Sequence, residues 1–208
     1  MQIGDYVVHI VDDEEPVRKS LAFLLTMAGF AVRIHDSATG FLAAATALGF
    51  GKACLVTDLR MPDMSGVELL EKLRAADAMV PAVVISGHGD VPMAVAAMKA
   101  GALDFIEKPF QDEVLIEAIR RAAERISQAP GKDDDVAAIR TRHAQLTERE
   151  RQGLAAVVAG LPNKTIAYDL DISPRTVEVH RANVMAKMQA RSLPELVRMT
   201  LAAELTDS

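Results

Sequence analysis

Apolar and polar positions follow a repeating pattern along the first 126 residues of the chain. Short apolar runs rich in β-branched residues have the length of buried strands, and each is followed by a segment with apolar residues at helical spacing. This alternation predicts an α/β fold in which a parallel sheet carries helices on both faces, with ligands bound at the carboxyl ends of the strands. The expected strands are residues 6–11, 31–35, 53–57, 82–86 and 104–107.

A different pattern follows. Residues 127–145 open with SQAPGKDDD, whose proline, glycine and charge run are typical of a linker, and then regain a short helical period. We therefore interpret them as a connector that includes at most one helix. Residues 146–208 predict an all-α unit of four helices, in which Thr147 and Glu150 form a capping box and Ser173 is an N-cap. A short helix, the tight turn DIS and a longer helix give a helix-turn-helix layout.

Charge is unevenly distributed between these regions. Residues 1–126 hold 18 acidic and 12 basic residues and so carry the whole net charge of −6, whereas residues 127–145 have 3 of each sign and residues 146–208 have 8 of each. A neutral second region lacks the strongly basic character of many nucleic-acid binders, so a DNA-binding role depends on local pattern. Locally, residues 173–191 hold four basic residues against the single acid Glu178.

The sequence also indicates where the protein works. No apolar run approaches the roughly 20 residues of a membrane span, and the N-terminus lacks the basic start and cleavage site of a signal peptide. We therefore expect a cytoplasmic protein. The single cysteine, Cys54, cannot form an internal disulfide, and its strand pattern favours a small buried hydrophobic residue.

Several polar residues stand where strands are expected to end. Asp12 and Asp13 end the first strand, Asp58 ends the third, Ser86 ends the fourth, and Lys108 follows the fifth. Three carboxylates at one edge repel one another unless a cation neutralises them, and Mg²⁺ or Mn²⁺ prefers such oxygen ligands. A carboxylate held in this way can attack phosphorus, with the serine hydroxyl and the lysine ammonium holding phosphoryl oxygens. The sequence thus predicts a phosphoacceptor at Asp58.

The motifs HIVDDEE, VTDLRMPDMSG, VVISGHGD and DFIEKPF resemble the receiver domain of two-component response regulators over residues 5–126. The resemblance implies a doubly wound five-stranded parallel sheet of order 2-1-3-4-5 and a domain of residues 1–126. It also implies a cis peptide before Pro109. The site residues that it implies are Asp58 as phosphoacceptor with Ser86 and Lys108, the metal ligands Asp12, Asp13, Asp58 and the Arg60 carbonyl, and the switch residues Phe105 and Pro109.

The second region has a resemblance of its own. LTERE, NKTIA, SPRTVEVH and KM occur in the register of the LuxR/FixJ-type output domain, a four-helix DNA-binding unit. In that family Glu178 and Val179 occupy recognition positions, and Ala182 stands where some relatives carry a long basic residue. Val177, Val184 and Met188 follow an apolar stripe and are expected in the core. The candidate DNA contacts are Lys164, Thr165, Arg175, Thr176, Glu178, Val179, Arg181 and Asn183.

Together the two resemblances imply a transcriptional regulator. A FixL-like sensor histidine kinase would phosphorylate Asp58, and the phosphorylated chain would form a homodimer, bind promoter DNA and act on RNA polymerase. The expected outcome is activation of nitrogen-fixation or oxygen-responsive genes. The chain is not expected to be an enzyme beyond assisting its own phosphorylation and dephosphorylation.

Two other functions fit parts of the pattern. A hydrolase of dehalogenase type also uses an aspartate nucleophile and Mg²⁺, but it normally carries a second aspartate two residues later, where this chain has Arg60. A phosphate-independent adaptor would not need a functional pocket, yet each pocket position holds a residue suited to phosphoryl chemistry.

Overall fold

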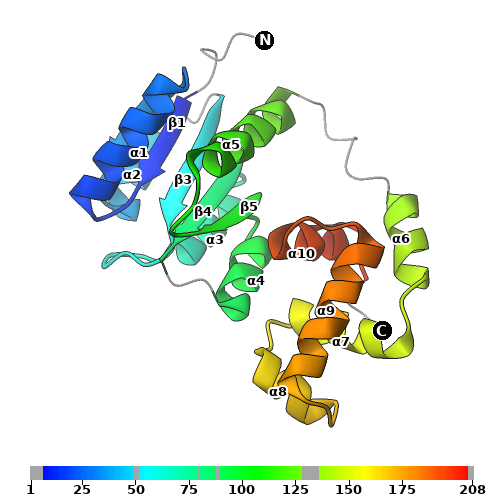
Figure 1. Cartoon of the computed structure of the whole chain (residues 1–208). Coiled ribbons are helices and arrows are strands. Elements are labelled where there is room, and N and C mark those ends of the chain that lie inside the picture. Colours follow the sequence, from blue (N-terminus) through cyan, green and yellow to red (C-terminus); the bar gives the residue numbers. More distant parts are fainter. Residues whose placement is uncertain (1–6, 49–51, 79, 88–89, 128–135, 206–208) are drawn as a thin grey trace. The chain divides into compact units, whose positions relative to one another are not determined.

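The computed structural model describes residues 7–48, 52–78, 80–87, 90–127 and 136–205 (Figure 1). Contacts divide the chain into two compact units: residues 1–89 with 100–129 form the first, and residues 90–99 with 130–208 form the second. Among the described residues, no helix has the length and apolar character needed to cross a lipid bilayer.

The first unit is built on a five-stranded parallel sheet of order β2-β1-β3-β4-β5, which confirms the predicted order. The strands and the helices that follow them are β1 (Val7–Val11), α1 (Glu15–Met27), β2 (Ala31–His35), α2 (Ala38–Leu48), β3 (Ala53–Asp58), α3 (Gly66–Ala75), β4 (Ala82–Ser86), α4 (Val91–Lys99), β5 (Asp104–Glu107) and α5 (Asp112–Ser127). Among these elements, α4 is grouped by its contacts with the second unit. The predicted strand of residues 6–11 agrees with β1 from residue 7 onward, and residue 6 lies outside the described residues.

Alternate residues of the strands face two different helix layers. Ile10, Val56 and Ile85 pack in one apolar cluster with α1 and α5, including Leu25 and Ile119. Figure 1 shows α5 in front of the sheet and α3 behind it. Since both faces are covered, the strands are apolar along most of their length, and polar side chains collect at the strand ends. Cys54 is fully buried in the same cluster, as predicted.

On the opposite face, α2 lies over β1 and β2. Phe41 of α2 is fully buried and contacts the rings of His9 and His35 edge-on, with centroids 5.3 Å away in each case. The two imidazoles are stacked, and His9 Nδ1 lies 2.9 Å from His35 Nε2. Since one ring must donate the shared proton, this contact fits a pair of neutral imidazoles.

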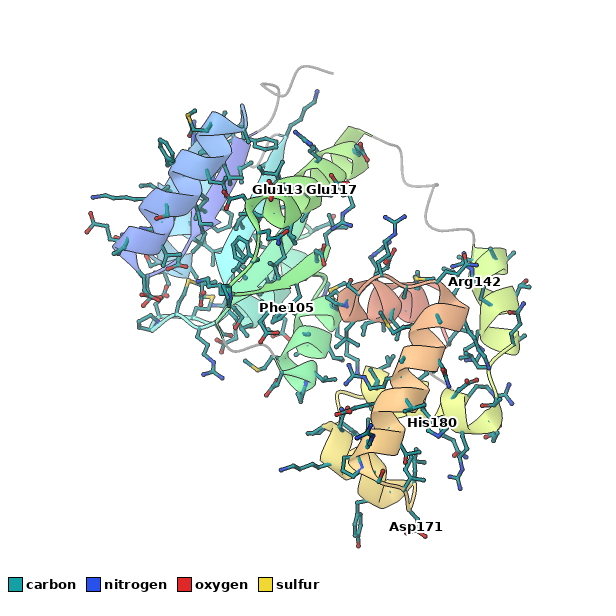
Figure 2. The ribbon with its side chains drawn as sticks, viewed as in Figure 1. Phe105, Glu113, Glu117, Arg142, Asp171 and His180 are labelled. Atoms are coloured by element: carbon teal, nitrogen blue, oxygen red, sulfur yellow. The ribbon has the colours of Figure 1, made fainter. Side chains whose placement is uncertain are left out.

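The second unit contains α6 (Val136–Ala144), α7 (Glu148–Val158), α8 (Asn163–Asp169), α9 (Pro174–Met188) and α10 (Leu193–Ala202). Its helices begin as the sequence predicts. Thr147 and Glu150 form a complete capping box at α7, and the Ser173 hydroxyl accepts from the Thr176 N–H at α9. The turn between α8 and α9 contains Asp171 in the left-handed region, with φ 54° (Figure 2).

The part of the predicted connector that the structure describes is mostly α6, whereas residues 128–135 lie outside the described residues. Ile139 of α6 is fully buried. Arg142, labelled in Figure 2, donates to the Met188 carbonyl at 2.9 Å, and Arg140 donates to the Ala203 carbonyl at 3.3 Å. Both carbonyls lie at the C-terminal end of a helix, where carbonyl groups have no intrahelical hydrogen-bond donor. These two arginines of α6 therefore stabilise the C-termini of α9 and α10.

Candidate functional site

Three predicted site residues meet at the carboxyl edge of the sheet. Asp58 is the last residue of β3, Asp12 follows β1, and Lys108 follows β5. Lys108 Nζ lies 2.8 Å from Asp58 Oδ1 and 3.3 Å from Asp12 Oδ2. The parallel register places these strand ends side by side, as the strand-end argument predicted.

The electrostatics of this cluster follow from burial and mutual contact. Asp12 is only 2 % exposed, and desolvation raises its pKa. The hydrogen bond from the Glu14 N–H lowers this pKa, and the charge of Asp58 raises it. Desolvation lowers the pKa of Lys108, but the hydrogen bond and charge of Asp58, joined by Asp12, raise it overall. The lysine is therefore a fixed cation that faces two carboxylates.

Ser86 and Phe105 lie on the two neighbouring strands. Ser86 ends β4 and is 2 % exposed, and its carbonyl accepts from the Lys108 N–H at 2.8 Å. Phe105 lies on β5 and is partly exposed (Figure 2). The Lys108–Pro109 peptide is cis, as the resemblance implied. Ser86 and Lys108 thus lie at adjacent strand ends, and Phe105 lies inside β5, paired with Val84 of β4.

The loop after Asp58 is held close to the carboxylate. The Arg60 N–H donates to Asp58 Oδ2 at 2.7 Å, so each carboxylate oxygen of Asp58 already accepts a hydrogen bond. Gly66 begins α3 directly beneath, and a Cβ there would lie 2.5 Å from the Asp58 carbonyl oxygen. Only glycine fits at this position, because the obstacle is backbone.

Two residues that support this edge were missed in the sequence. The Arg18 guanidinium donates to the Asp12 carbonyl at 2.6 Å. Asp63 accepts from both the N–H and the hydroxyl of Thr39, each at 2.9 Å, and these bonds lower its pKa against the opposing effect of desolvation. Asp63 thereby ties the loop after β3 to the start of α2. Asp63 and Thr39 are 24 residues apart in the sequence, so no local sequence pattern predicts their contact.

The donor atoms at this edge suit a hard cation. Asp12, Asp58, the exposed Asp13 and the Arg60 carbonyl offer oxygen only, which is the ligand type of Mg²⁺. In the described residues no three His, Cys, Asp or Glu side chains are arranged as a ready metal site. The three carboxylates Asp12, Asp13 and Asp58 carry more negative charge than the Lys108 ammonium can neutralise. The residues therefore fit a divalent cation both by ligand type and by charge.

The second unit contains the predicted DNA surface. On α9, Val177, Val184 and Met188 are buried, as predicted. Thr176 and Arg181 are partly buried; the Thr176 hydroxyl lies 2.8 Å from that of Ser173. The candidate contacts exposed on α8 and α9 are Lys164, Thr165, Arg175, Glu178, Val179 and Asn183.

Arg181 is the candidate whose guanidinium is engaged by another helix of the same unit. Its Nη1 donates to Asn163 Oδ1 at 2.9 Å, a contact within the unit. The helical spacing assigned it to an outer face, but the side chain is long enough to reach across to α8.

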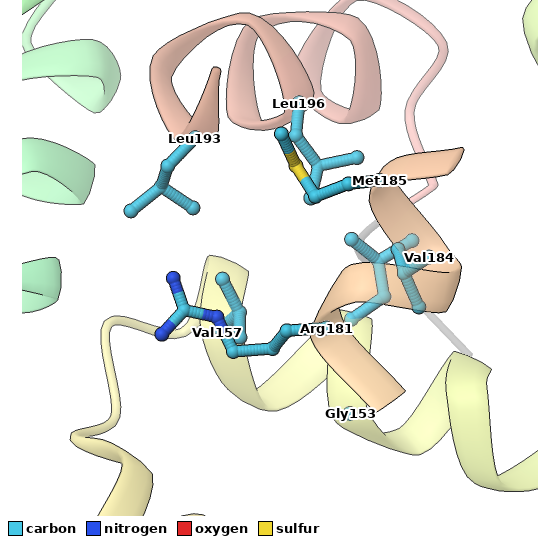
Figure 3. Close-up of a pocket in the computed structure, with 8 residues that line it drawn as sticks. Gly153, Val157, Arg181, Val184, Met185, Leu193 and Leu196 are labelled. Atoms are coloured by element: carbon cyan, nitrogen blue, oxygen red, sulfur yellow. The ribbon is translucent and has the colours of Figure 1, made fainter. Parts of the chain in front are cut away.

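A small cavity of about 20 Å³ lies between α7, α9 and α10, room for about one water molecule (Figure 3). Gly153 of α7 and the stem of Arg181 line it together with apolar side chains.

Glu150 and Lys187 form a second ion pair, inside this unit, in which the carboxylate is buried and the ammonium is partly exposed. Lys187 Nζ lies 2.6 Å from Glu150 Oε2, and the Glu150 side chain is 5 % exposed. The Thr147 N–H also donates to Glu150 at 2.7 Å. The hydrogen bond from Lys187, followed by that from Thr147, lowers the pKa of Glu150. The pair joins α7 to α9 and thereby fixes the position of the predicted recognition helix.

Comparison with known proteins agrees with this architecture. Residues 8–120 match the response regulator receiver domain, and residues 144–200 match the bacterial regulatory proteins of the luxR family. The transcriptional regulatory protein FixJ of Rhizobium meliloti is 70 % identical over 198 residues, which cover 95 % of this chain and 96 % of that protein. FixJ of Azorhizobium caulinodans is 56 % identical over 94 % of this chain and 92 % of its own.

A crystal structure of full-length FixJ from B. japonicum is 48 % identical and covers 96 % of this chain and 97 % of its own, with a TM-score of 0.56. The matched families and the described elements agree over both units. The chain therefore belongs to the response regulators, as a two-component transcriptional regulator with a receiver domain and a LuxR-type DNA-binding domain.

Proposed function

We propose that Asp58 accepts a phosphoryl group from a sensor histidine kinase. The observation that carries this proposal is the placement of Lys108 Nζ against both Asp58 and Asp12, at 2.8 Å and 3.3 Å. A carboxylate oxygen of Asp58 attacks phosphorus, the phosphorus–nitrogen bond of the kinase phosphohistidine breaks, and the imidazole leaves. Lys108 then holds one phosphoryl oxygen and the Ser86 hydroxyl donates to another.

Divalent cation binding belongs to the same proposal. Asp12, Asp13, Asp58 and the Arg60 carbonyl would hold Mg²⁺ or Mn²⁺, which supplies charge neutralisation to the transferred group when bound. Their oxygen-only donor set and surplus negative charge support this. The chain's own part is to hold Asp58 in place, through the Arg60 N–H and the Lys108 ammonium, while the phosphoryl group approaches.

Phosphorylation would then change the surface of the receiver. The added charge draws Ser86 and the following loop inward, Phe105 and Pro109 move with them, and the face around α4 and β5 forms a homodimer. Two DNA-binding domains joined in this way gain affinity by effective concentration. Residues 1–126 would act as the receiver, residues 127–145 as the connector and residues 146–208 as the DNA-binding domain.

The proposal extends to the DNA contacts, and the exposure of these residues on α8 and α9 supports it. Lys164, Thr165 and Arg175 would contact the phosphate backbone, and Glu178, Val179 and Asn183 would contact base edges. A cytoplasmic regulator of this kind would recruit RNA polymerase to its promoters. The 70 % identity to a protein named FixJ supports a FixL-like kinase as partner and activation of nitrogen-fixation or oxygen-responsive genes.

Intact mass measurement and size-exclusion chromatography test this function together. The wild type, Asp58→Asn and the control Asp77→Asn are incubated with acetyl phosphate and Mg²⁺. Asp77 is an exposed acid with φ 52°, a backbone conformation that asparagine tolerates. The wild type and the control should each gain one phosphoryl group and elute as dimers, and Asp58→Asn should do neither. Phosphorylation and dimerisation of Asp58→Asn would exclude Asp58 as the site.

A further inference from the structure

Arg181 was predicted to contact DNA, but its guanidinium is engaged inside the DNA-binding unit. The side chain leaves α9 and its Nη1 donates to Asn163 Oδ1, the first residue of α8, at 2.9 Å. Figure 3 shows the guanidinium lying in the space between α7 and α10, beside Val157 and Leu193. The stem of Arg181 lines the small cavity there, so both its polar and its apolar parts are used within the domain.

The position of this hydrogen bond gives it a mechanical consequence. The helices α8 and α9 are joined through the chain only at one end, by the turn around Asp171. Asn163 lies at the opposite end of α8, and Arg181 lies seven residues into α9. At 1.5 Å per residue, both points are about 10 Å from the turn. The Arg181–Asn163 hydrogen bond thus closes a triangle of two helix segments and constrains the angle between them, in addition to the apolar cluster that Ile166 and Ala167 form with Val177.

Among the residues that the structure describes, Arg181 is the one side chain that hydrogen-bonds to the first turn of α8. Its N-cap is Pro162, which makes no capping hydrogen bond. Lys164 and Thr165 follow directly and are exposed. Their distance from Glu178 and Val179 on α9 therefore depends on the angle that Arg181 holds.

We propose that Arg181 is a positioning residue for DNA binding, which sets the angle between α8 and α9 through Asn163 and makes no DNA contact of its own. The inference rests on the proposed DNA surface. With the angle fixed, the residues of α8 and α9 engage one duplex without first being ordered, and the entropic cost of binding falls. This gain in affinity requires a duplex that contacts α8 and α9 at the same time.

The test compares Arg181→Met and Asn163→Ala in the full-length chain treated with acetyl phosphate and Mg²⁺. Methionine keeps an apolar stem in the cavity and removes the donors, whereas alanine removes only the acceptor. Fluorescence anisotropy measures binding to a 30-base-pair duplex selected by the wild type from a random library, and to an unselected duplex, across a salt series. Both variants should bind the selected duplex about tenfold more weakly, as expected for a hydrogen bond to a charged group.

Three further readouts separate positioning from direct contact. The slope of log affinity against log salt should stay at the wild-type value, binding to the unselected duplex should not change, and the double variant should be no weaker than either single one. A direct phosphate contact predicts a slope smaller by about 0.9 per protomer in Arg181→Met and normal binding by Asn163→Ala. That result would overturn the proposal.

Lys164→Ala and Glu178→Ala serve as controls for the DNA surface itself. Lys164→Ala should lower the salt slope and weaken both duplexes, and Glu178→Ala should weaken the selected one. If neither variant changes binding, the proposed surface is wrong. If both weaken binding while Arg181→Met and Asn163→Ala bind normally, only the positioning role is wrong. Thermal melting by circular dichroism confirms folding, and Asn163→Ala keeps the test valid if Arg181→Met melts early.

Discussion

Each unit of this response regulator contains a lysine that contacts a largely buried carboxylate, and the two contacts differ in their charge balance. In the DNA-binding domain, Lys187 meets the single acid Glu150 at 2.6 Å. In the receiver, Lys108 meets both Asp58 and Asp12. The first contact is neutral, and its Glu150 Oε2 also accepts from the Thr147 N–H, whereas the second contact has a surplus of negative charge.

The difference separates a structural ion pair from a functional one. A partly desolvated pair with equal charges and satisfied hydrogen bonds needs no further partner. A cluster with surplus negative charge is destabilised by repulsion until it binds a cation or takes up a proton. Desolvation is the main cause of the raised pKa of Asp12, and the charge of Asp58 acts in the same direction. Residue types alone do not distinguish these cases; the ratio of acids to lysine does.

Breaking the balanced pair should have the largest effect. Glu150→Ala leaves the Lys187 ammonium partly buried without its acid and removes the capping box of α7. We expect the free energy of unfolding of the DNA-binding domain to fall by about 3 kcal/mol. Urea denaturation followed by circular dichroism measures the loss. Glu148→Ala, which breaks the exposed pair with Arg151, is the matched control and should cost less than about 0.5 kcal/mol. Equal losses in the two variants would contradict the assignment.

Acid should weaken β1 and α2 of the receiver before it weakens α7 of the DNA-binding domain. Desolvation, with smaller contributions from His35 and Arg33, lowers the pKa of His9 from 6.5 to about 4. Because the unfolded state then binds more protons between pH 6.5 and pH 4, receiver stability falls as the pH drops through this window. At pH 5 the loss from His9 alone is about 2 kcal/mol.

The pKa of Glu150 is also lowered, but its stabilisation is lost in a more acidic window. Its folded-state pKa lies below 4.5, so its stabilisation is complete above that pH and is lost only as the pH falls further. Hydrogen exchange of the full chain at pH 7 and pH 5, corrected for intrinsic rates, should show loss of protection in β1 and α2 but not in α7. His9→Asn should reduce this pH dependence. An unchanged dependence in His9→Asn would show that other groups cause it.

Removing one acid from the receiver edge should stabilise it. Asp13 is exposed next to Asp12, and Asp13→Asn reduces the surplus charge. Without divalent cations we expect the unfolding free energy of the receiver to rise by about 1 kcal/mol. Melting curves with and without MgCl₂ provide the measurement: Mg²⁺ should stabilise the wild type and Asp77→Asn, but not Asp13→Asn. Stabilisation of all three variants by Mg²⁺ would remove Asp13 from the proposed ligands.

Much of the fold was predictable because each element carries its own signal. Strand-length apolar runs gave the strands to within a residue, and Thr147, Glu150 and Ser173 marked helix starts that the structure confirms. The strand order came from the family resemblance, since apolar periodicity does not encode it. The contact of Lys108 with Asp12 and Asp58 followed from the rule that parallel strand ends share one edge.

Contacts between remote side chains were not predictable in this way. Asp63 reaches Thr39 and Arg181 reaches Asn163 only because particular helix angles and loop paths bring them within hydrogen-bond distance. Helical spacing placed Arg181 on an outer face, but a long side chain can turn back to a neighbouring helix. Packing gaps leave no trace in the sequence either, because they depend on how closely the surrounding helices approach.

The gap beside Gly153 gives the smallest expected effect. Gly153 lies inside α7 and lines the cavity between α7, α9 and α10, and a Cβ built there meets no atom within 4 Å (Figure 3). Gly153→Ala should therefore raise the unfolding free energy of the DNA-binding domain by about 1 kcal/mol, through lower unfolded-state entropy and a filled gap. Urea denaturation should show a higher midpoint with an unchanged slope.

Gly160→Ala is the matched control for this last change. Gly160 follows α7 with φ 83°, a left-handed conformation in which alanine is strained, so the same substitution should lower the midpoint. A lower midpoint for Gly153→Ala as well would mean that α7 and α9 approach more closely in solution. If the midpoint instead rises as expected, packing limits the stability of the DNA-binding domain, whereas surplus negative charge limits the stability of the receiver.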